Sequence, residues 1–354
     1  MLVDDSAIIR GLMQRALKAD EQIDIVATAV DGKMALDVLK RIPADIIILD
    51  IEMPVMDGLT ALPELLKLSP KTRVIMASTL TLRNAEISLR AMELGASDYI
   101  AKPSAQDPSE VNEFYRQLIA KIKALAQVEA TTTSAPTQAA AALMPMPLPM
   151  GDSGITVRQS TQPPLTGALA IASSTGGPQA LLHIFREFKG KKLRVPIFIT
   201  QHMPANFTTI LAQHIASASG YDCHEAKDGE EVKPATVYIA PGDFHMTIAR
   251  SGTSVVLKLD QNPQENYCRP SADPMLRSLA RVYGNQLLVA VLTGLGADGA
   301  RGAVDVVKAG GTVIAQDEAT SVVYGMPKAV ADAKLTSAIF PLAQIPGYVM
   351  KAIT

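Results

Sequence analysis

Residues 46–62 read IIILDIEMPVMDGLTAL, and this stretch decides the fold of the N-terminal part of the chain. Its opening run is continuously apolar, which is typical of a β-strand covered on both faces. Asp50 ends the run, a turn with proline and glycine follows, and an amphipathic segment begins at Leu59. A buried strand, a turn and a helix in this order predict one unit of a parallel α/β sheet.

The same alternation continues on both sides of this unit. We expect a first domain over residues 1–125, in which short apolar runs alternate with amphipathic segments of helical period. The predicted strands are 1–3, 24–29, 45–49, 73–77 and 98–101, and the predicted helices are 7–19, 32–39, 59–68, 83–94 and 108–127.

A second α/β pattern follows a change in composition. Residues 126–164 are rich in Ala, Thr, Pro and Met and predict a flexible linker. Residues 165–354 predict a Rossmann-like, mainly parallel sheet. An antiparallel hairpin is inserted at 236–259, where the pattern alternates around two turns. The other strands are the apolar runs at 168–173, 195–200, 287–293 and 312–316, with helices at 178–188, 206–218, 272–283 and 299–308.

Composition narrows the class of protein. With 354 residues, 48% of them hydrophobic and 19% charged, the chain is long and apolar enough for two cores. A net charge of −2 argues against electrostatic binding to nucleic acid. We see no signal peptide and no apolar run of membrane-spanning length, so we expect a cytoplasmic protein with no direct membrane insertion. The two cysteines form no metal-binding pattern, and we expect reduced thiols.

Polar residues gather where the strands of the first domain end. Asp4 and Asp5, Asp50, Ser78 and Lys102 all fall at the carboxyl ends of predicted strands, which meet at one edge of a parallel sheet. Converging carboxylates need a cation, and an all-oxygen site suits Mg²⁺. One carboxylate can then attack a phosphoryl donor. A single Asp after a strand is usually a cap, so the joint arrangement carries this prediction.

The motifs of this domain resemble those of two-component response-regulator receiver domains. They are VDDSAIIR at 3–10, the stretch 46–62, VIMAS at 74–78 and DYIAKP at 98–103. The resemblance implies a flavodoxin-like (βα)5 fold and a cis bond before Pro103. The first strand is shorter than such domains usually have, and we expect the natural chain to begin earlier. The implied site comprises the phosphoacceptor Asp50, the Mg²⁺ ligands Asp4, Asp5, Asp50 and the Glu52 backbone carbonyl, the switch residues Ser78 and Tyr99, and the phosphate partner Lys102.

The second chemical site begins at IASSTGGPQAL, residues 171–181. A strand ends, hydroxyl residues and glycines form a turn, and Pro178 starts a helix. Such a turn can cradle a phosphate, although no nucleotide-binding motif is present. Alternatively it presents Ser174 as a nucleophile with main-chain amides at the oxyanion. A serine in such a turn is most often only a helix cap, so the sequence must also supply a base and an acid.

Five histidines are candidates for the base. His183 and His214 fall in predicted helices, where we expect packing or surface positions, and His224 lies among charged residues, where we expect a surface position. His202 directly follows a buried strand at the rim expected for Ser174, and His245, in a turn, is the second choice. For the acid, Asp298 lies in a glycine-rich loop after another buried strand; capping the next helix is its ordinary alternative role.

These motifs resemble the catalytic domain of the chemotaxis protein-glutamate methylesterases, the CheB family. They are the stretch 171–181, ITQHMP at 199–204, IAPGDFHM at 239–246, RPSAD at 269–273, LTGLGADGA at 292–300 and SVVYGMPKA at 321–329. The resemblance implies the triad Ser174, His202 and Asp298, and oxyanion contacts at Thr175, Gly176 and Leu295. Leu295 stands where methionine is common, and Ala172-Ser173 where Gly-Ala is common.

The resemblance also implies a function and its partners. It implies a phosphorylation-activated hydrolase that removes methyl esters from chemoreceptor glutamates and deamidates receptor glutamines. The implied partners are a chemotaxis histidine kinase and methyl-accepting chemoreceptors, with recruitment to membrane-embedded receptor arrays, and we expect a monomer. A binding module without chemistry is the rival hypothesis. A transcription factor is disfavoured, because residues 165–354 contain no helix-turn-helix pattern or basic face.

Overall fold

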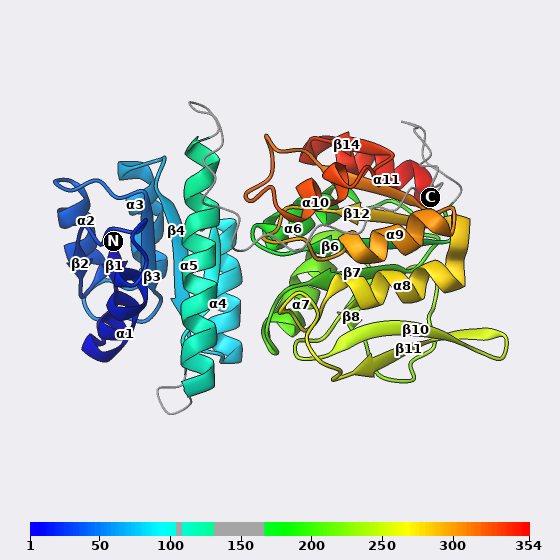
Figure 1. The fold of residues 1–354 in the computed structure, drawn as a ribbon, viewed down its shortest axis with the longest axis horizontal. Coiled ribbons are helices and arrows are strands. Elements are labelled where there is room, and N and C mark those ends of the chain that lie inside the picture. Colours follow the sequence, from blue (N-terminus) through cyan, green and yellow to red (C-terminus); the bar gives the residue numbers. More distant parts are fainter. Residues whose placement is uncertain (104–107, 131–165) are drawn as a thin grey trace. The chain divides into compact units, whose positions relative to one another are not determined.

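The computed structural model describes residues 1–103, 108–130 and 166–354 (Figure 1). The chain separates into two compact units, Met1–Ala135 and Pro136–Thr354. The linker predicted at 126–164 lies outside the described residues from position 131 onward, and α5 runs to Ala130. None of the helices within the described ranges is both long and apolar enough to cross a membrane.

The first unit is a five-stranded parallel sheet in the order β2-β1-β3-β4-β5. This order is the flavodoxin-like arrangement that the receiver resemblance implies. The second strand is shorter than predicted, two residues rather than six. The elements are β1 (Leu2–Val3), α1 (Ala7–Lys18), β2 (Thr28–Ala29), α2 (Gly32–Leu39), β3 (Ile46–Asp50), α3 (Gly58–Leu68), β4 (Arg73–Ser78), α4 (Leu82–Glu93), β5 (Asp98–Ala101) and α5 (Pro108–Ala130).

Local hydrogen bonds explain where the helices of this unit begin. Ser6, Asp31, Asp57 and Thr81 each precede a helix, and each side chain accepts a hydrogen bond from a main-chain N–H in the first turn. Such caps pair groups that a helix start otherwise leaves unpaired. The strand Ile46–Asp50 is buried on both faces from Ile47 onward, as its apolar run predicts.

The second unit holds a seven-stranded parallel sheet in the order β14-β13-β12-β6-β7-β9-β8. Its strands are β6 (Ala168–Ser173), β7 (Ile197–Gln201), β8 (Asp222–Glu225), β9 (Thr236–Ile239), β12 (Leu287–Val291), β13 (Thr312–Gln316) and β14 (Ala338–Phe340). Its helices are α6 (Gly177–Glu187), α7 (Phe207–Ser219), α8 (Ala272–Tyr283), α9 (Ala300–Lys308), α10 (Met326–Asp332) and α11 (Ile345–Ile353), with 3₁₀ turns at Gly284–Gln286 and Leu342–Gln344.

The segment 236–259 differs in part from its prediction. Its first portion, β9, pairs in parallel with β7 and β8 inside the main sheet. Only β10 (His245–Ser251) and β11 (Ser254–Asp260) form the antiparallel hairpin, as a separate two-stranded sheet. The run TVYI is fully buried, and burial on both faces favours a place inside the parallel sheet.

The order of strands in the second unit creates a switch point between β6 and β12. From β6 the chain proceeds to β7 on one side of it, and later returns to place β12 and β13 on the other side. On one face, α8 contacts β6 and β12, and α9 contacts β13; on the other face, α6 packs against α7 and α11 (Figure 1). Loops that leave neighbouring strands in opposite directions open a crevice at their carboxyl ends.

One backbone expectation is wrong. The cis peptide bond in the described ranges is Arg269–Pro270, and the bond before Pro103 is not cis.

Candidate phosphoacceptor site and active site

Four charged side chains meet at the carboxyl end of the first sheet. Asp4 and Asp5 follow β1, Asp50 ends β3, and Lys102 follows β5. Carboxylate oxygens of the three aspartates lie within 4.8 Å of one another. Lys102 Nζ is 2.7 Å from Asp4 Oδ2 and 2.6 Å from Asp50 Oδ1. The structure thus brings together the charged residues that we predicted at the carboxyl ends of the strands.

The charge balance of this cluster suits a cation. Burial, together with the neighbouring Asp4, raises the pKa of Asp50 to about 6 although Lys102 opposes the rise. Asp4 is fully buried, and its Oδ2 accepts no hydrogen bond of regular geometry. The main chain of Glu52 hydrogen-bonds to the Asp50 carboxylate and therefore lies at the rim of the cluster. Three carboxylates against one ammonium leave an all-oxygen, negatively charged site, which fits Mg²⁺.

The two predicted switch residues lie on the adjoining strands. Ser78 ends β4, one residue beyond Ala77, the register partner of Asp50, and its buried Oγ donates a hydrogen bond to the carbonyl of Thr79 at 3.1 Å. Tyr99 in β5 is buried, and this burial raises the pKa of its phenol well above the usual value. Ser78 is close enough in the sheet to face a group on Asp50, while the Tyr99 ring lies inside the domain.

The turn after β6 holds Ser174 in a fixed position. The Ser174 N–H donates to the Thr293 carbonyl at 3.0 Å, and the Gly177 N–H donates to the Ser174 carbonyl at 2.7 Å. Gly176 has φ +75°, and a Cβ atom there would lie 2.5 Å from Val322. The turn therefore needs glycine both for its left-handed backbone and for space.

A buried glutamine supports the same turn from below. Ser173 Oγ donates to Gln201 Oε1 at 2.7 Å, and Gln201 Nε2 donates to the carbonyl of Ser174 at 2.9 Å. Ser173 and Gln201 are 0% and 1% exposed. The last residue of β7 thus fixes the turn that carries Ser174.

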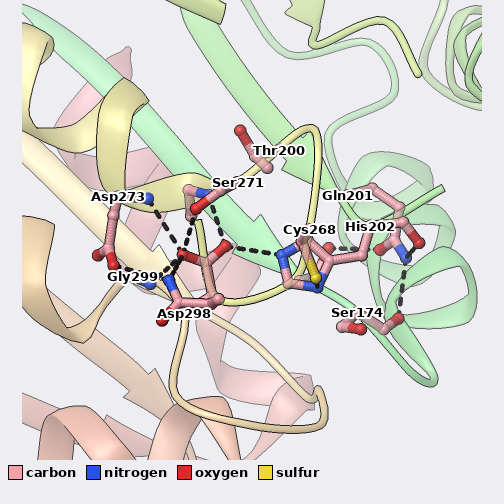
Figure 2. A network of polar contacts seen from close by, with 12 residues as sticks. Ser174, Thr200, Gln201, His202, Cys268, Ser271, Asp273, Asp298 and Gly299 are labelled. Atoms are coloured by element: carbon pink, nitrogen blue, oxygen red, sulfur yellow. Dashed lines mark hydrogen bonds and ion pairs between the residues drawn. The ribbon is translucent and has the colours of Figure 1, made fainter. Parts of the chain in front are cut away.

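His202 and Asp298 form a close pair beside this turn. His202 Nε2 is 2.7 Å from Asp298 Oδ2; the Asp298 side chain is buried, and that of His202 is 11% exposed. Figure 2 shows Ser174 beyond the imidazole, on the side away from Asp298. Since Nε2 is bonded to the carboxylate, Nδ1 is the nitrogen left to serve Ser174. The three residues lie at one rim of the sheet, although no hydrogen bond joins Ser174 Oγ to His202 in the described residues.

Asp298 is held by an unusual number of donors. Its Oδ2 also accepts from the Ala272 N–H at 2.6 Å, and its Oδ1 accepts from Ser271 Oγ at 2.6 Å. Further donors to Oδ1 are the side chain of Asn266 and the main-chain N–H groups of Asp273 and Gly299. Burial alone would raise the pKa of Asp298, but the hydrogen bonds and the His202 charge lower it below its usual value. The carboxylate is thus ionised and rigidly oriented.

Asp298 also caps a helix, which is the alternative role expected for it, but the helix is not the one predicted. The carboxylate does not cap α9, whose N-cap Gly299 has no side-chain hydrogen bond. It lies instead at the start of α8, where it pairs the N–H groups of Ala272 and Asp273. The N-terminal end of a helix stabilises an anion, so α8 helps to keep Asp298 charged.

Main-chain amides are available on both sides of Ser174. No hydrogen bond is assigned to the N–H of Gly176 or of Leu295 within the part of the chain that the structure describes. Thr175 is buried, and its carbonyl accepts from Thr293 Oγ1 at 2.9 Å. The loops after β6 and β12 therefore provide donors of the kind that bind a developing oxyanion.

Comparisons with known proteins match both units of the chain. A family model described as response regulator receiver domain matches residues 1–113, and one described as CheB methylesterase matches residues 169–349. A "Protein-glutamate methylesterase/protein-glutamine glutaminase 1" of Paramagnetospirillum magneticum is 51% identical, covering 99% of this chain and 95% of that protein. The chain belongs to the CheB methylesterase family. A further relative, a "Protein-glutamate methylesterase/protein-glutamine glutaminase" of Azospirillum brasilense, is 49% identical, covering 99% and 91%.

A solved structure of the CheB family supports the fold of the second unit. The crystal structure of the Thermotoga maritima CheB methylesterase catalytic domain is 41% identical to this chain, with a TM-score of 0.51. It covers 52% of this chain and 98% of that one. The resemblance to the CheB family and the α/β class are thereby confirmed.

Within this CheB protein, two of the remaining histidines have polar partners away from Ser174. His245, the second choice for the base, is buried; its Nε2 lies 3.1 Å from the Pro263 carbonyl, and its Nδ1 accepts from the Ser271 N–H at 3.2 Å. Both nitrogens are thus occupied by the main chain, which leaves none for Ser174. His224 is partly buried rather than on the surface, between Asp222 and Glu230.

Four residues around the CheB triad were not assigned a role from the sequence: Gln201, Asn266, Cys268 and Ser271. Gln201 and Ser271 lie within recognised motifs, ITQHMP and RPSAD, so their neighbourhood was visible but their contacts were not. Asn266 and Cys268 lie in an irregular loop without period. Only the fold brings that loop to Asp298 and His202.

Proposed function

We propose that this chain hydrolyses γ-glutamyl methyl esters of methyl-accepting chemoreceptors and deamidates receptor glutamines, under control of phosphorylation at Asp50. The observation that carries the proposal is the His202–Asp298 pair, 2.7 Å apart, at the switch point next to the Ser174 turn. The relatives that match nearly the whole chain are named as protein-glutamate methylesterases and protein-glutamine glutaminases, which supports the choice of substrate.

In the proposed reaction His202 Nδ1 accepts the Ser174 proton while Ser174 Oγ attacks the ester carbonyl carbon. The carbonyl oxygen becomes an oxyanion held by main-chain N–H groups of the Thr175–Gly176 turn and Leu295. His202 returns its proton to the methoxy group, methanol leaves, and an acyl-serine remains. Water, deprotonated by His202, then attacks the acyl carbon and releases glutamate and Ser174. An amide passes through the same sequence and releases ammonia.

Asp298 acts through His202 and not on the substrate. Its carboxylate accepts the Nε2 proton, which leaves the Nδ1 lone pair directed toward Ser174, and it stabilises the imidazolium that forms. The six hydrogen-bond donors around Asp298 fix this orientation in advance.

Loss of the serine hydroxyl tests the catalytic proposal. Ser174→Ala in the full chain should lower kcat for methanol release from methylated receptor by several orders of magnitude. Ser173→Ala is the matched control, because its hydroxyl is buried against Gln201 and should cost far less. Near-normal methanol release by Ser174→Ala would contradict the assignment, as would failure of a serine-directed probe to label Ser174, which the rival binding module predicts.

Regulation is proposed at the first site. Asp4, Asp5 and Asp50, with the Glu52 carbonyl, would hold Mg²⁺, which neutralises the carboxylates and binds phosphoryl oxygens. An Asp50 carboxylate oxygen attacks the phosphorus of a phosphohistidine on a chemotaxis kinase, and the phosphorus–nitrogen bond breaks. Lys102 then pairs with the phosphoryl group, and Ser78 and Tyr99 rearrange around it. The unphosphorylated receiver domain restrains the esterase, and the phosphorylated one releases it.

Asp50→Asn separates this control from catalysis. With a small-molecule phosphodonor and Mg²⁺, the wild-type esterase rate should rise and the Asp50→Asn rate should stay at its basal value. A variant that is stimulated as strongly as wild type would rule out Asp50 as the phosphoacceptor.

We further propose that the protein is a monomer in the cytoplasm and that it is recruited to receptor arrays through its substrate.

A further inference from the structure

Cys268 lies against the catalytic imidazole. Its Sγ is 3.4 Å from His202 Nδ1, within hydrogen-bond reach for sulfur. Figure 2 shows the sulfur and Ser174 at the same end of the ring, opposite Asp298. Cys268 is a free, partly buried thiol, whereas the second cysteine of the chain, Cys223, is buried in β8.

The loop holds this cysteine in place by a tight turn. The Cys268 N–H donates to the Glu265 carbonyl at 2.9 Å, and the two residues between them, Asn266 and Tyr267, have φ +54° and +60°. Left-handed backbone is unfavourable for residues with side chains, above all for a tyrosine. Asn266 anchors the turn because its side chain donates to both Asp273 and Asp298. A conformation kept against its own preference points to a position that the site requires.

The contact creates a competition for one nitrogen. Nε2 of His202 is bonded to Asp298, so Nδ1 is the remaining nitrogen, and the sulfur of Cys268 occupies it. No hydrogen bond is assigned to Ser174 Oγ among the residues that the structure describes. A single ring nitrogen cannot accept the serine proton while it is engaged with the sulfur.

We propose that Cys268 is a positioning residue of the resting enzyme: its sulfur pairs with Nδ1 of His202 and must be displaced by Ser174 before hydrolysis begins. This inference rests on the proposed role of His202 as the base. It makes Cys268 a restraint on activity at neutral pH that lies within the catalytic domain itself.

The charges around the ring act in the same direction. Burial lowers the pKa of His202, but the sulfur of Cys268 and the carboxylate of Asp298 raise it to about 10. Asp273 and Arg277 of α8 lie one step further away: Asp273 interacts with Asp298, and Arg277 pairs mainly with Glu265. Removing the sulfur removes one of two groups that favour the imidazolium and leaves Asp298 in place. The neutral base should then exist at lower pH.

The test measures the titration of His202 and the esterase in parallel, with the full chain throughout. Ring resonances of His202 are followed by NMR against pH in wild type, Cys268→Ser and Cys268→Ala. We expect the midpoint of His202 to fall by about one pH unit or more in both variants. The low-pH limb of kcat/KM for methanol release should shift equally, because it reports the base of the free enzyme. Near neutral pH, each unit by which the pKa of His202 falls should make kcat/KM about tenfold larger, because ten times more of the enzyme holds the neutral base.

Cys223→Ala is the matched control. Burial raises the pKa of the Cys223 thiol, which stays neutral, and β8 is an edge strand separated from β7 by β9. Neither the His202 midpoint nor the low-pH limb of kcat/KM should therefore move. An unchanged His202 midpoint in both Cys268 variants would overturn the inference. An equal loss of esterase rate at every pH, in Cys268 variants with the circular dichroism of wild type, would also overturn it, because a purely structural role of Cys268 predicts that result. Failure of the triad itself would appear separately, as activity in Ser174→Ala with the NMR shift intact.

Discussion

Replacing Asp298 by asparagine is the sharpest perturbation of the proposed triad. The two carboxylate oxygens have different partners: Oδ1 accepts four hydrogen bonds, and Oδ2 accepts two, from His202 Nε2 and the Ala272 N–H. An asparagine has only one acceptor oxygen, and this oxygen will occupy the Oδ1 position, where four donors lie. The amide NH₂ group then faces His202 and Ala272, both of which were donors.

This exchange changes the tautomer of the base. With an NH₂ group opposite, His202 Nε2 must accept, so the ring proton moves to Nδ1, the nitrogen that serves Ser174. A ring that carries a proton there cannot receive another from serine. We expect kcat to fall by about four orders of magnitude, or roughly 5 kcal/mol of transition-state stabilisation.

The same exchange costs stability by a smaller amount. The Ala272 N–H loses its acceptor, which costs about 1–3 kcal/mol for a buried donor. The start of α8 loses an anion, worth up to about 2 kcal/mol when buried. These costs lie below the usual stability of a domain, about 5–15 kcal/mol. The variant should therefore fold with a lowered Tm.

Methanol release from methylated receptor, together with calorimetry, decides the matter. Asn266→Ala is a useful comparison, since it removes one of the four donors to Oδ1 without touching the His202 contact. A folded Asp298→Asn variant with a rate within tenfold of wild type would refute the tautomer argument and, with it, the role of Asp298.

Two further predictions concern the phosphoacceptor site and the serine turn. The pKa of Asp50 is raised to about 6, so its contribution to stability is present at low pH and is lost as pH rises through 6. Mg²⁺ should therefore raise the Tm of the receiver domain more at pH 7 than at pH 5. Equal increases in Tm at the two pH values would contradict this. Gly176→Ala should lower both the Tm and the esterase rate, because its Cβ would lie 2.5 Å from Val322. Gly190 also has a positive φ, +76°, but has open space around it, so Gly190→Ala should cost only about 1 kcal/mol of stability and no activity. Equal effects of the two variants on activity would exclude a special role for the Gly176 turn.

The parts of the fold that the sequence predicted are those with a strong local pattern. Buried parallel strands such as Ile46–Asp50 are continuous apolar runs, and α8 was predicted with its observed ends because its apolar face recurs at helical spacing. The strand Asp222–Glu225 was missed because its four residues are mostly polar. The segment at 236–239 was assigned to a hairpin because the turn that follows it suggested antiparallel pairing. Its true partners, β7 and β8, are separated from it by sequence that carries no sign of the pairing.

The site divides in the same way. Ser174, His202 and Asp298 could be predicted because each follows a buried strand, and parallel topology brings such positions to one edge. The partners of those residues could not. Asn266 and Cys268 reach the triad through a loop whose path depends on two residues with positive φ, and nothing in its composition indicates that path.

Asp298 joins the stability of the catalytic domain to its chemistry. The carboxylate that orients His202 also pairs the first N–H groups of α8, which packs on β6 and β12 beneath the site. Its pKa is lowered in the folded protein, so its contribution to stability is present above the pKa of an unfolded aspartate and is lost as pH falls through the folded value. Protonation would therefore weaken the helix start and release the imidazole in one event.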